Sequence, residues 1–183
     1  MYDQPEGDLP GRQESAVLVP VFRDAEGELR LVLVVRGERG LHGGQIGLPG
    51  GRVEIVDASP LDTALREAEE EIGLTPDDVE IVGSLAPVDT RTTGFRVHPF
   101  VARISPPVQW RVAAGEITGV VTPLVRELAS PAARRRQALS FPTWPEERVV
   151  DGVRVEGGHL LWGLTLRLLD PVLVRLLAGE WGL

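Results

Sequence analysis

Three glutamates in the middle of the chain share one face of a predicted helix. Glu67, Glu70 and Glu71 are spaced i, i+3 and i+4, and a rotation of about 100° per residue places them within a sector of about 100°. Glu69 falls on the opposite flank. Like charges this close on a helix are destabilising unless a cation lies among them. Hard carboxylate oxygens at this spacing suit Mg²⁺ or Mn²⁺, which also bind water and substrate phosphate oxygens.

The residues around the three glutamates carry helix start and stop signals. Ser59 can cap the N-terminus, Pro60 suits the first helical position, and Asp62 complements the helix dipole. Gly73 can end the helix in the left-handed conformation. The sequence therefore predicts a helix over 60–72. Its apolar stripe, which we expect to pack on a sheet, consists of Leu61, Ala64, Leu65, Ala68 and Ile72.

A bare acidic run is more often a solvated helix face than a metal site. The preceding loop changes that assessment, because Gln45–Glu54 contains the pair Gly50-Gly51. Paired glycines let backbone N–H and C=O groups approach a ligand with no Cβ in the way. Arg66, one turn before Glu70, is placed to orient that carboxylate.

Together the loop and the helix closely resemble the Nudix signature. In that signature a Gly-Gly loop precedes a helix of the pattern R-E-U-x-E-E-x-G-U, where U is aliphatic, and Arg66–Leu74 reads Arg-Glu-Ala-Glu-Glu-Glu-Ile-Gly-Leu. In the family five residues usually separate the glycine from a glutamate, and seven residues separate that glutamate from the arginine. Here Asp57 takes that place and eight residues separate it from Arg66. This departure is what we expect of the coenzyme A diphosphatase branch.

Three further segments resemble that branch. The upstream motif of the branch, R-S…R…H-x-G-x-x-x-F-P-G-G, is similar to Arg36 followed by Leu41–Gln45 and Leu48–Gly51. Its TALREA segment is similar to residues 63–68, and its IWGxT segment is similar to residues 159–165. The upstream match is one residue short. It has Gly40 in place of an arginine, and Gly37 and Leu48 in place of Ser and Phe.

The resemblance implies a divalent-metal-dependent diphosphatase that cleaves coenzyme A to 3′,5′-ADP and 4′-phosphopantetheine. Glu67, Glu70 and Glu71 would hold the metal, with Glu70 also assisting deprotonation of water and Arg66 supporting it. The substrate-binding residues would be Arg36, His42, Gly44, Gly50 and Gly51. Two alternatives remain: a Nudix hydrolase acting on ADP-ribose or another nucleoside diphosphate derivative, and a non-catalytic nucleotide-binding module. The retained glutamates disfavour the second.

Several other residues have two interpretations. His42 can face substrate or only bond the backbone of its loop, and His98 in its predicted strand is better explained as structural. Trp162, at helical spacing among leucines, fits a core residue or an adenine platform. Many Nudix enzymes bring an extra carboxylate from a loop, and the candidates for it are Glu116, Glu146 and Glu147.

The wider pattern predicts an α/β fold, a Nudix-type α/β/α sandwich with a mixed central sheet and a C-terminal helix. Residues 1–14 form a loose lead-in and 15–183 one domain. Gly37–Gly51 is rich in glycine, which predicts a shaped loop. Arg134–Arg136 is predicted to be a solvated helix end. Leu160–Leu177 is predicted to be helical, with a kink or the start of a second helix at Pro171. Strands are expected at 16–22, 29–36, 79–88, 95–104 and 117–122.

Composition limits the function further. The 27 acidic against 19 basic residues give a net charge of −8, which argues against nucleic acid as the partner. No cysteine is present, so thiolate metal sites and disulfides are excluded. No stretch has the roughly 18 apolar residues of a membrane span. We therefore expect a cytoplasmic protein with a small nucleotide substrate, and the leucine-rich tail fits either its own core or a homodimer.

Overall fold

The computed structural model describes residues 12–37, 44–90, 94–107, 109–140 and 146–183. Its main sheet is mixed, because β1 and β8 run parallel while their other neighbours are antiparallel. The strand order is β2-β1-β8-β6, with β5 on β1 and β7 on β8. These strands are β1 (Gln13–Arg23), β2 (Leu29–Leu31), β5 (Gly50–Arg52), β6 (Val79–Ser84), β7 (Val88–Asp89) and β8 (Phe95–Ile104).

Two smaller sheets complete the strand structure. One has the order β4-β3-β9 and brings the glycine-rich segment beside two other strands. The other has the order β10-β11-β12. Their strands are β3 (Leu33–Arg36), β4 (Ile46–Gly47), β9 (Ile117–Val121), β10 (Arg134–Leu139), β11 (Arg148–Arg154) and β12 (Leu160–Trp162).

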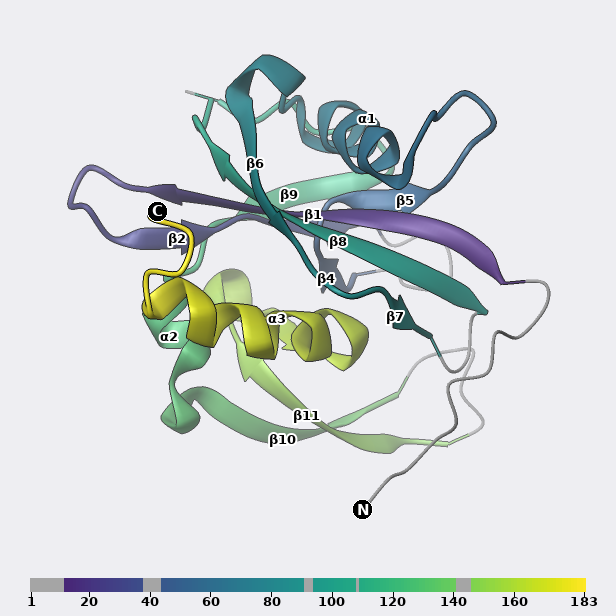
Figure 1. Ribbon diagram of the computed structural model, residues 1–183. Helices are drawn as coiled ribbons and strands as arrows, with labels where there is room; N and C mark the ends of the chain where they lie inside the picture. The colour runs from purple at the N-terminus through teal and green to yellow at the C-terminus, as the bar shows by residue number, and fades with distance from the viewer. Residues whose placement is uncertain (1–11, 38–43, 91–93, 108, 141–145) are drawn as a thin grey trace.

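Helices lie on both sides of the main sheet (Figure 1). The acidic helix α1 (Pro60–Ile72) covers one face, and α2 (Val125–Ala129) and α3 (Gly163–Leu177) lie on the other, with β10 and β11 beyond α3. Three short 3₁₀ helices are η1 (Pro76–Asp78), η2 (Pro131–Ala133) and η3 (Glu156–Gly158). The predicted α/β/α sandwich with a mixed sheet is confirmed.

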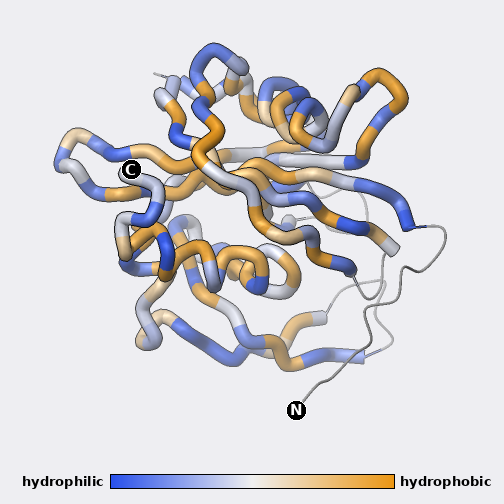
Figure 2. The backbone as a smooth tube through the Cα atoms, in the orientation of Figure 1, coloured by the Kyte–Doolittle hydropathy of each residue, from blue (hydrophilic) through white to orange (hydrophobic). Residues whose placement is uncertain are grey.

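Strand β1 shows how the sequence divides the core between the two faces. Ala16 and Leu18 belong to the cluster that packs against α1, whereas Val19 and Val21 belong to the cluster that contains α3. All four are fully buried, as the period of two along a strand requires. The apolar run of β1 lies between the layers in Figure 2.

The capping signals of α1 are confirmed. The Ser59 hydroxyl accepts from the Asp62 N–H at 3.3 Å and donates to the Asp62 carboxylate at 2.9 Å. Gly73 ends the helix at φ 70°, in the left-handed region. On the predicted stripe, Ala64 and Ala68 are fully buried, as is Ile72, while Leu61 and Leu65 are only partly buried.

Three local predictions differ from the structure, because strand pairing decided the conformation of these segments. Gly37–Gly51 is not only loop, since β4 pairs with β3 and Gly50 opens β5 on β1. Arg134–Arg136 is the start of β10 rather than a helix end. The segment 79–88 is interrupted after Ser84 and forms β6 and part of β7.

The tail also differs from its prediction. Leu160–Trp162 pairs with β11 as strand β12, so the helix begins only at Gly163. Pro171 lies inside that single helix, which does not restart there. The buried face of α3 packs in the same cluster as Val19 and Val21.

The division into a lead-in of 1–14 and a domain of 15–183 remains a prediction. Strand β1 begins at Gln13, so the last two residues of the predicted lead-in already pair with β8. Among the described residues, no helix is both long and apolar enough to cross a membrane.

Candidate active site

Glu71 is a buried carboxylate held between the glycine loop and β3. Its side chain is 5% exposed, and its Oε2 accepts the Gly50 N–H at 3.1 Å. The Arg36 guanidinium lies 3.6 Å from Oε1, and its Nη2 also donates to the Gly50 carbonyl at 3.4 Å. Burial raises the pKa of Glu71 to about 7, although Arg36 and the Gly50 N–H act in the opposite direction.

Gly50 and Gly51 are required for two different reasons. Gly50 has φ 150°, and a Cβ there would stand 2.3 Å from the Ala16 carbonyl oxygen. A Cβ on Gly51 would stand 2.2 Å from Glu67 Oε1. The first glycine therefore lets the loop lie against β1, and the second keeps the Glu67 carboxylate uncovered.

Arg66 bridges most of the remaining charges. Its Nη1 donates to Glu67 Oε1 and to Glu70 Oε2, each at 3.0 Å. Its Nε and Nη2 donate to the two oxygens of Asp57 at 2.9 and 3.0 Å, and Nη2 also reaches the Arg52 carbonyl at 3.2 Å. The predicted contact with Glu70 is present, but Arg66 positions Glu67 as well.

Asp57 holds Arg66 in place through two hydrogen bonds, a role that we did not predict from the sequence. Its side chain is 3% exposed and also accepts from the Thr63 hydroxyl and the Glu54 N–H, each at 2.8 Å. The Arg66 hydrogen bonds hold the pKa of Asp57 well below its usual range. Its place between Gly51 and Arg66, where the family signature has a glutamate, was the signal that could have revealed it.

Glu116, just before β9, is the loop carboxylate that the fold brings near the cluster. Its charge raises the pKa of both Glu67 and Glu71, although for each of these burial is the largest cause. The Glu116 carbonyl accepts the Gly37 N–H at 2.7 Å, which fixes this turn beside Arg36. Glu146 and Glu147 are exposed, and no interaction found among the described residues joins them to the cluster.

The carboxylates fit a divalent cation by their chemistry and surroundings. Within the described ranges no three acidic, cysteine or histidine side chains already form a metal site. Arg66 bonds one oxygen each of Glu67 and Glu70. Among the described residues no hydrogen bond is found to the second oxygen of either glutamate, and Gly51 presents no side chain to Glu67. Hard oxygen donors from Glu67, Glu70, Glu71 and Glu116 are the set that Mg²⁺ and Mn²⁺ prefer.

The predicted substrate-binding residues are only partly brought together. Arg36, Gly50 and Gly51 adjoin the carboxylates, whereas Gly44 is exposed in the turn that follows β3 and bonds the Arg36 and Gly37 carbonyls. His42 lies outside the described residues. His98 is bonded to Glu14 at 2.5 Å, which fits the structural role expected for it.

Comparisons with known proteins found matches in sequence and in fold. A family model described as "NUDIX domain" matches residues 12–139. A protein named uncharacterized Nudix hydrolase NudL from Salmonella paratyphi B is 34% identical over 90% of this chain and 83% of its own. One of the same name from Citrobacter koseri is 42% identical over 64% of this chain and 60% of its own. The crystal structure of a NUDIX hydrolase from Nitrosomonas europaea superposes with a TM-score of 0.63 at 13% identity, covering 93% of this chain and 75% of that one.

Proposed function

The chain belongs to the Nudix family, and from that premise we propose that it hydrolyses the diphosphate of coenzyme A to 3′,5′-ADP and 4′-phosphopantetheine with Mg²⁺ or Mn²⁺. As a Nudix hydrolase it acts on a nucleoside diphosphate derivative, and Nudix hydrolases generally use divalent metals. The observation that carries the proposal is the contact of Gly50 and Gly51 with Glu71 and Glu67. This contact joins the glycine loop, along which we expect the phosphates to lie, to the carboxylates.

Glu67, Glu70 and Glu71 would hold the cation in this proposal. When bound, a divalent cation neutralises phosphate oxygens and lowers the pKa of water near it. In the reaction a water oxygen bonds to phosphorus, the bridging P–O bond breaks, and the water proton must leave. Glu70, the most exposed of the three at 59%, is our choice to accept that proton, with Arg66 holding its other oxygen in place.

Gly50 and Gly51 would line the path of the phosphates, since neither presents a side chain there. Arg36, which faces Glu71 and the Gly50 carbonyl, would contact a phosphate oxygen from beside this loop. Glu116 would add a fourth carboxylate to the three that hold the cation. A cytoplasmic location and a homodimer through the leucine-rich tail remain predictions.

The choice of coenzyme A rests on sequence segments that the fold brings to the site. The segment Thr63–Ala68 supplies the Asp57 contact and three of the five residues of the apolar stripe, Ala64, Leu65 and Ala68. The segment His159–Thr165 ends beside the glycine loop, because Thr165 Oγ1 lies 3.8 Å from where a Gly47 Cβ would stand. The alternative substrate, ADP-ribose, is favoured by one observation: Gly40 and Gly37 stand where the branch has polar or cationic side chains.

The deciding experiment is chromatographic. The protein is incubated with coenzyme A and either Mg²⁺ or Mn²⁺, and we expect 3′,5′-ADP to appear and its formation to stop on addition of a chelator. Survival of coenzyme A together with cleavage of ADP-ribose would instead assign the alternative substrate. If neither compound were cleaved while both bound, the non-catalytic interpretation would hold.

The proposed proton acceptor has its own test. We expect Glu70→Gln to reduce kcat by about 10²–10⁴-fold, the usual contribution of a positioned base. Glu116→Gln makes the same substitution at the loop carboxylate just before β9 and is the matched variant. Turnover of Glu70→Gln within a few-fold of wild type would show that this assignment is wrong, and a larger loss in Glu116→Gln would transfer the role.

A further inference from the structure

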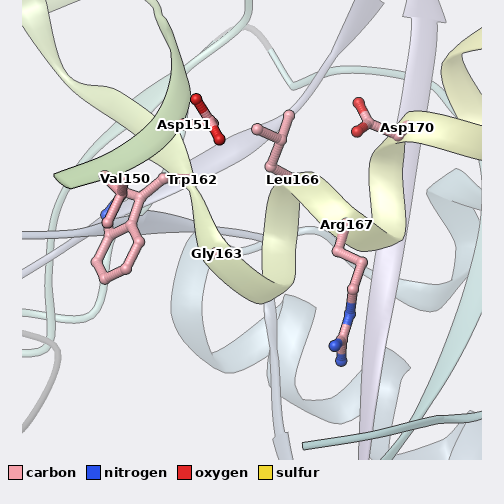
Figure 3. A pocket seen from close by; sticks show the side chains of 7 residues that line it. All are labelled: Val150, Asp151, Trp162, Gly163, Leu166, Arg167 and Asp170. Atoms are coloured by element: carbon pink, nitrogen blue, oxygen red, sulfur yellow. The ribbon is translucent and has the colours of Figure 1, made fainter. Parts of the chain in front are cut away.

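A cleft of about 550 Å³ opens between β11, β12 and the first two turns of α3 (Figure 3). The side chains that matter for its chemistry are those of Val150, Asp151, Trp162, Leu166, Arg167 and Asp170. The cleft is shallow and widely open to solvent. No role for this cleft follows from the carboxylate cluster itself.

The first turn of α3 reaches both the cleft and the residues beside the acidic site. Thr165 Oγ1 and Arg36 Nε each lie 3.8 Å from the place of a Gly47 Cβ, and Arg36 in turn faces Glu71. Gly163 and Leu166, on the same turn of the helix as Thr165, line the cleft. A substrate whose diphosphate lies at the glutamates can therefore extend along this turn into the cleft.

The walls of the cleft combine apolar surface with hydrogen-bond acceptors. Val150 and Leu166 are aliphatic, and Trp162 is a half-buried indole beside Val150. Asp151 and Asp170 stand on either side of Leu166 in Figure 3. Each uses its Oδ1 for an arginine outside the cleft, Arg136 and Arg134 respectively. The second oxygen of each carboxylate can accept an N–H or O–H from a ligand.

The charged groups select against a phosphorylated ligand at this place. Arg167 carries the one guanidinium among the seven lining residues, but it points to the other side of α3 in Figure 3 and donates to the Asp89 carbonyl at 3.1 Å. Asp151 and Asp170 are each paired with an arginine that does not line the cleft, so the lining residues offer a phosphate two carboxylates and no guanidinium directed at it. The chemistry that fits is an uncharged arm with amide and hydroxyl donors and with methyl groups for the apolar walls.

Coenzyme A has one arm of that kind and one that is unsuitable, because its adenosine end carries the 3′-phosphate. We propose that the cleft binds the pantetheine arm and directs the 3′-phosphoadenosine end away from α3. This inference rests on the proposed function. It makes Trp162 and Asp151 specificity-determining residues that recognise a substrate by its amide-bearing arm.

The test measures binding of the two products separately. Calorimetric titration of 4′-phosphopantetheine and of 3′,5′-ADP into the protein with Mn²⁺ is carried out for wild type, Trp162→Ala and Asp151→Asn. We expect Trp162→Ala to weaken 4′-phosphopantetheine about tenfold, as loss of a buried aromatic contact does, and Asp151→Asn to weaken it about threefold. Binding of 3′,5′-ADP should remain unchanged in both.

Matched variants separate recognition from damage to the fold. Trp162→Phe keeps an aromatic wall and should restore most of the affinity, while Asp77→Asn neutralises an exposed carboxylate between α1 and β6 and should change nothing. The proposal is overturned if wild type does not bind 4′-phosphopantetheine, or if both products weaken equally in Trp162→Ala. Cleavage of coenzyme A is assayed in parallel, so loss of the proposed function with intact arm binding would be recognised as a separate failure.

Discussion

Two carboxylates on opposite sides of the acidic helix α1, Glu71 and Asp57, are held in opposite ways. On the loop side, Glu71 is buried, lies 3.6 Å from its nearest guanidinium group, and has a raised pKa. On the arginine side, Asp57 makes two short bonds to Arg66 and has a lowered pKa. Burial without close pairing destabilises a charge, whereas pairing stabilises it. The loop side is therefore suited to bind a cation, and the arginine side is suited to hold the site in position.

The sharpest test of this difference is Glu71→Gln. We expect kcat/KM to fall by about 10²–10³-fold, the scale of losing one group that stabilises transition-state charge. The metal-free stability should change by less than about 1 kcal/mol, because a neutral amide replaces a buried carboxyl of the same shape. Kinetics and urea unfolding in chelator measure the two effects. A large loss of stability with intact kinetics would reverse the roles of the two sides.

The adjacent glycines divide stability from activity. Gly50→Ala should lower the unfolding free energy by about 3 kcal/mol, because it adds backbone strain and a clash with the Ala16 carbonyl. Gly51→Ala meets only the movable end of Glu67. It should keep most of the stability and lower kcat by about 10- to 100-fold, as displaced metal ligands do. Equal effects of the two variants in denaturation and kinetics would contradict this division.

Asp57→Asn should affect stability more than chemistry. Loss of its charged hydrogen bonds should lower the unfolding free energy by about 1–3 kcal/mol at pH 7. Because the folded pKa of Asp57 lies below its unfolded value of about 3.9, the stabilisation is present above pH 4 and is lost as the pH falls further. Urea unfolding at pH 7 and pH 3 should show the difference between wild type and variant shrinking in acid. A constant difference would mean that the charge of Asp57 is not responsible.

Glu69→Gln should have the smallest effect. Glu69 is exposed and points away from the cluster, so kcat should stay within about twofold and stability within about 0.5 kcal/mol. Steady-state assay and urea unfolding of this variant provide the reference for the other helix substitutions. A substantial loss of activity would show that the acidic site extends around the helix.

Prediction from the sequence succeeded where the signal lies within a few turns of chain. The Ser59 cap, the Gly73 stop and the Arg66–Glu70 contact all depend on residues spaced within one helix. It failed for β4, β5 and β12, because a strand of two or three residues is stable only when it pairs with another strand, and so short a segment does not reveal that partner by its own residue types. Asp57 was missed as an anchor for the related reason that a loop must fold back on the helix to place it.

The sequence by itself determined the acidic face, its caps, the glycine pair and hence the Nudix family of the chain. These are consequences of residue type and helical geometry. Only the tertiary structure decided that Glu71 is buried while Glu70 is exposed, that Glu116 is the loop carboxylate near the cluster, and that Trp162 lines a cleft. Burial and the approach of distant charges depend on how β1, β3, β9 and α3 pack, and no spacing along the chain specifies that.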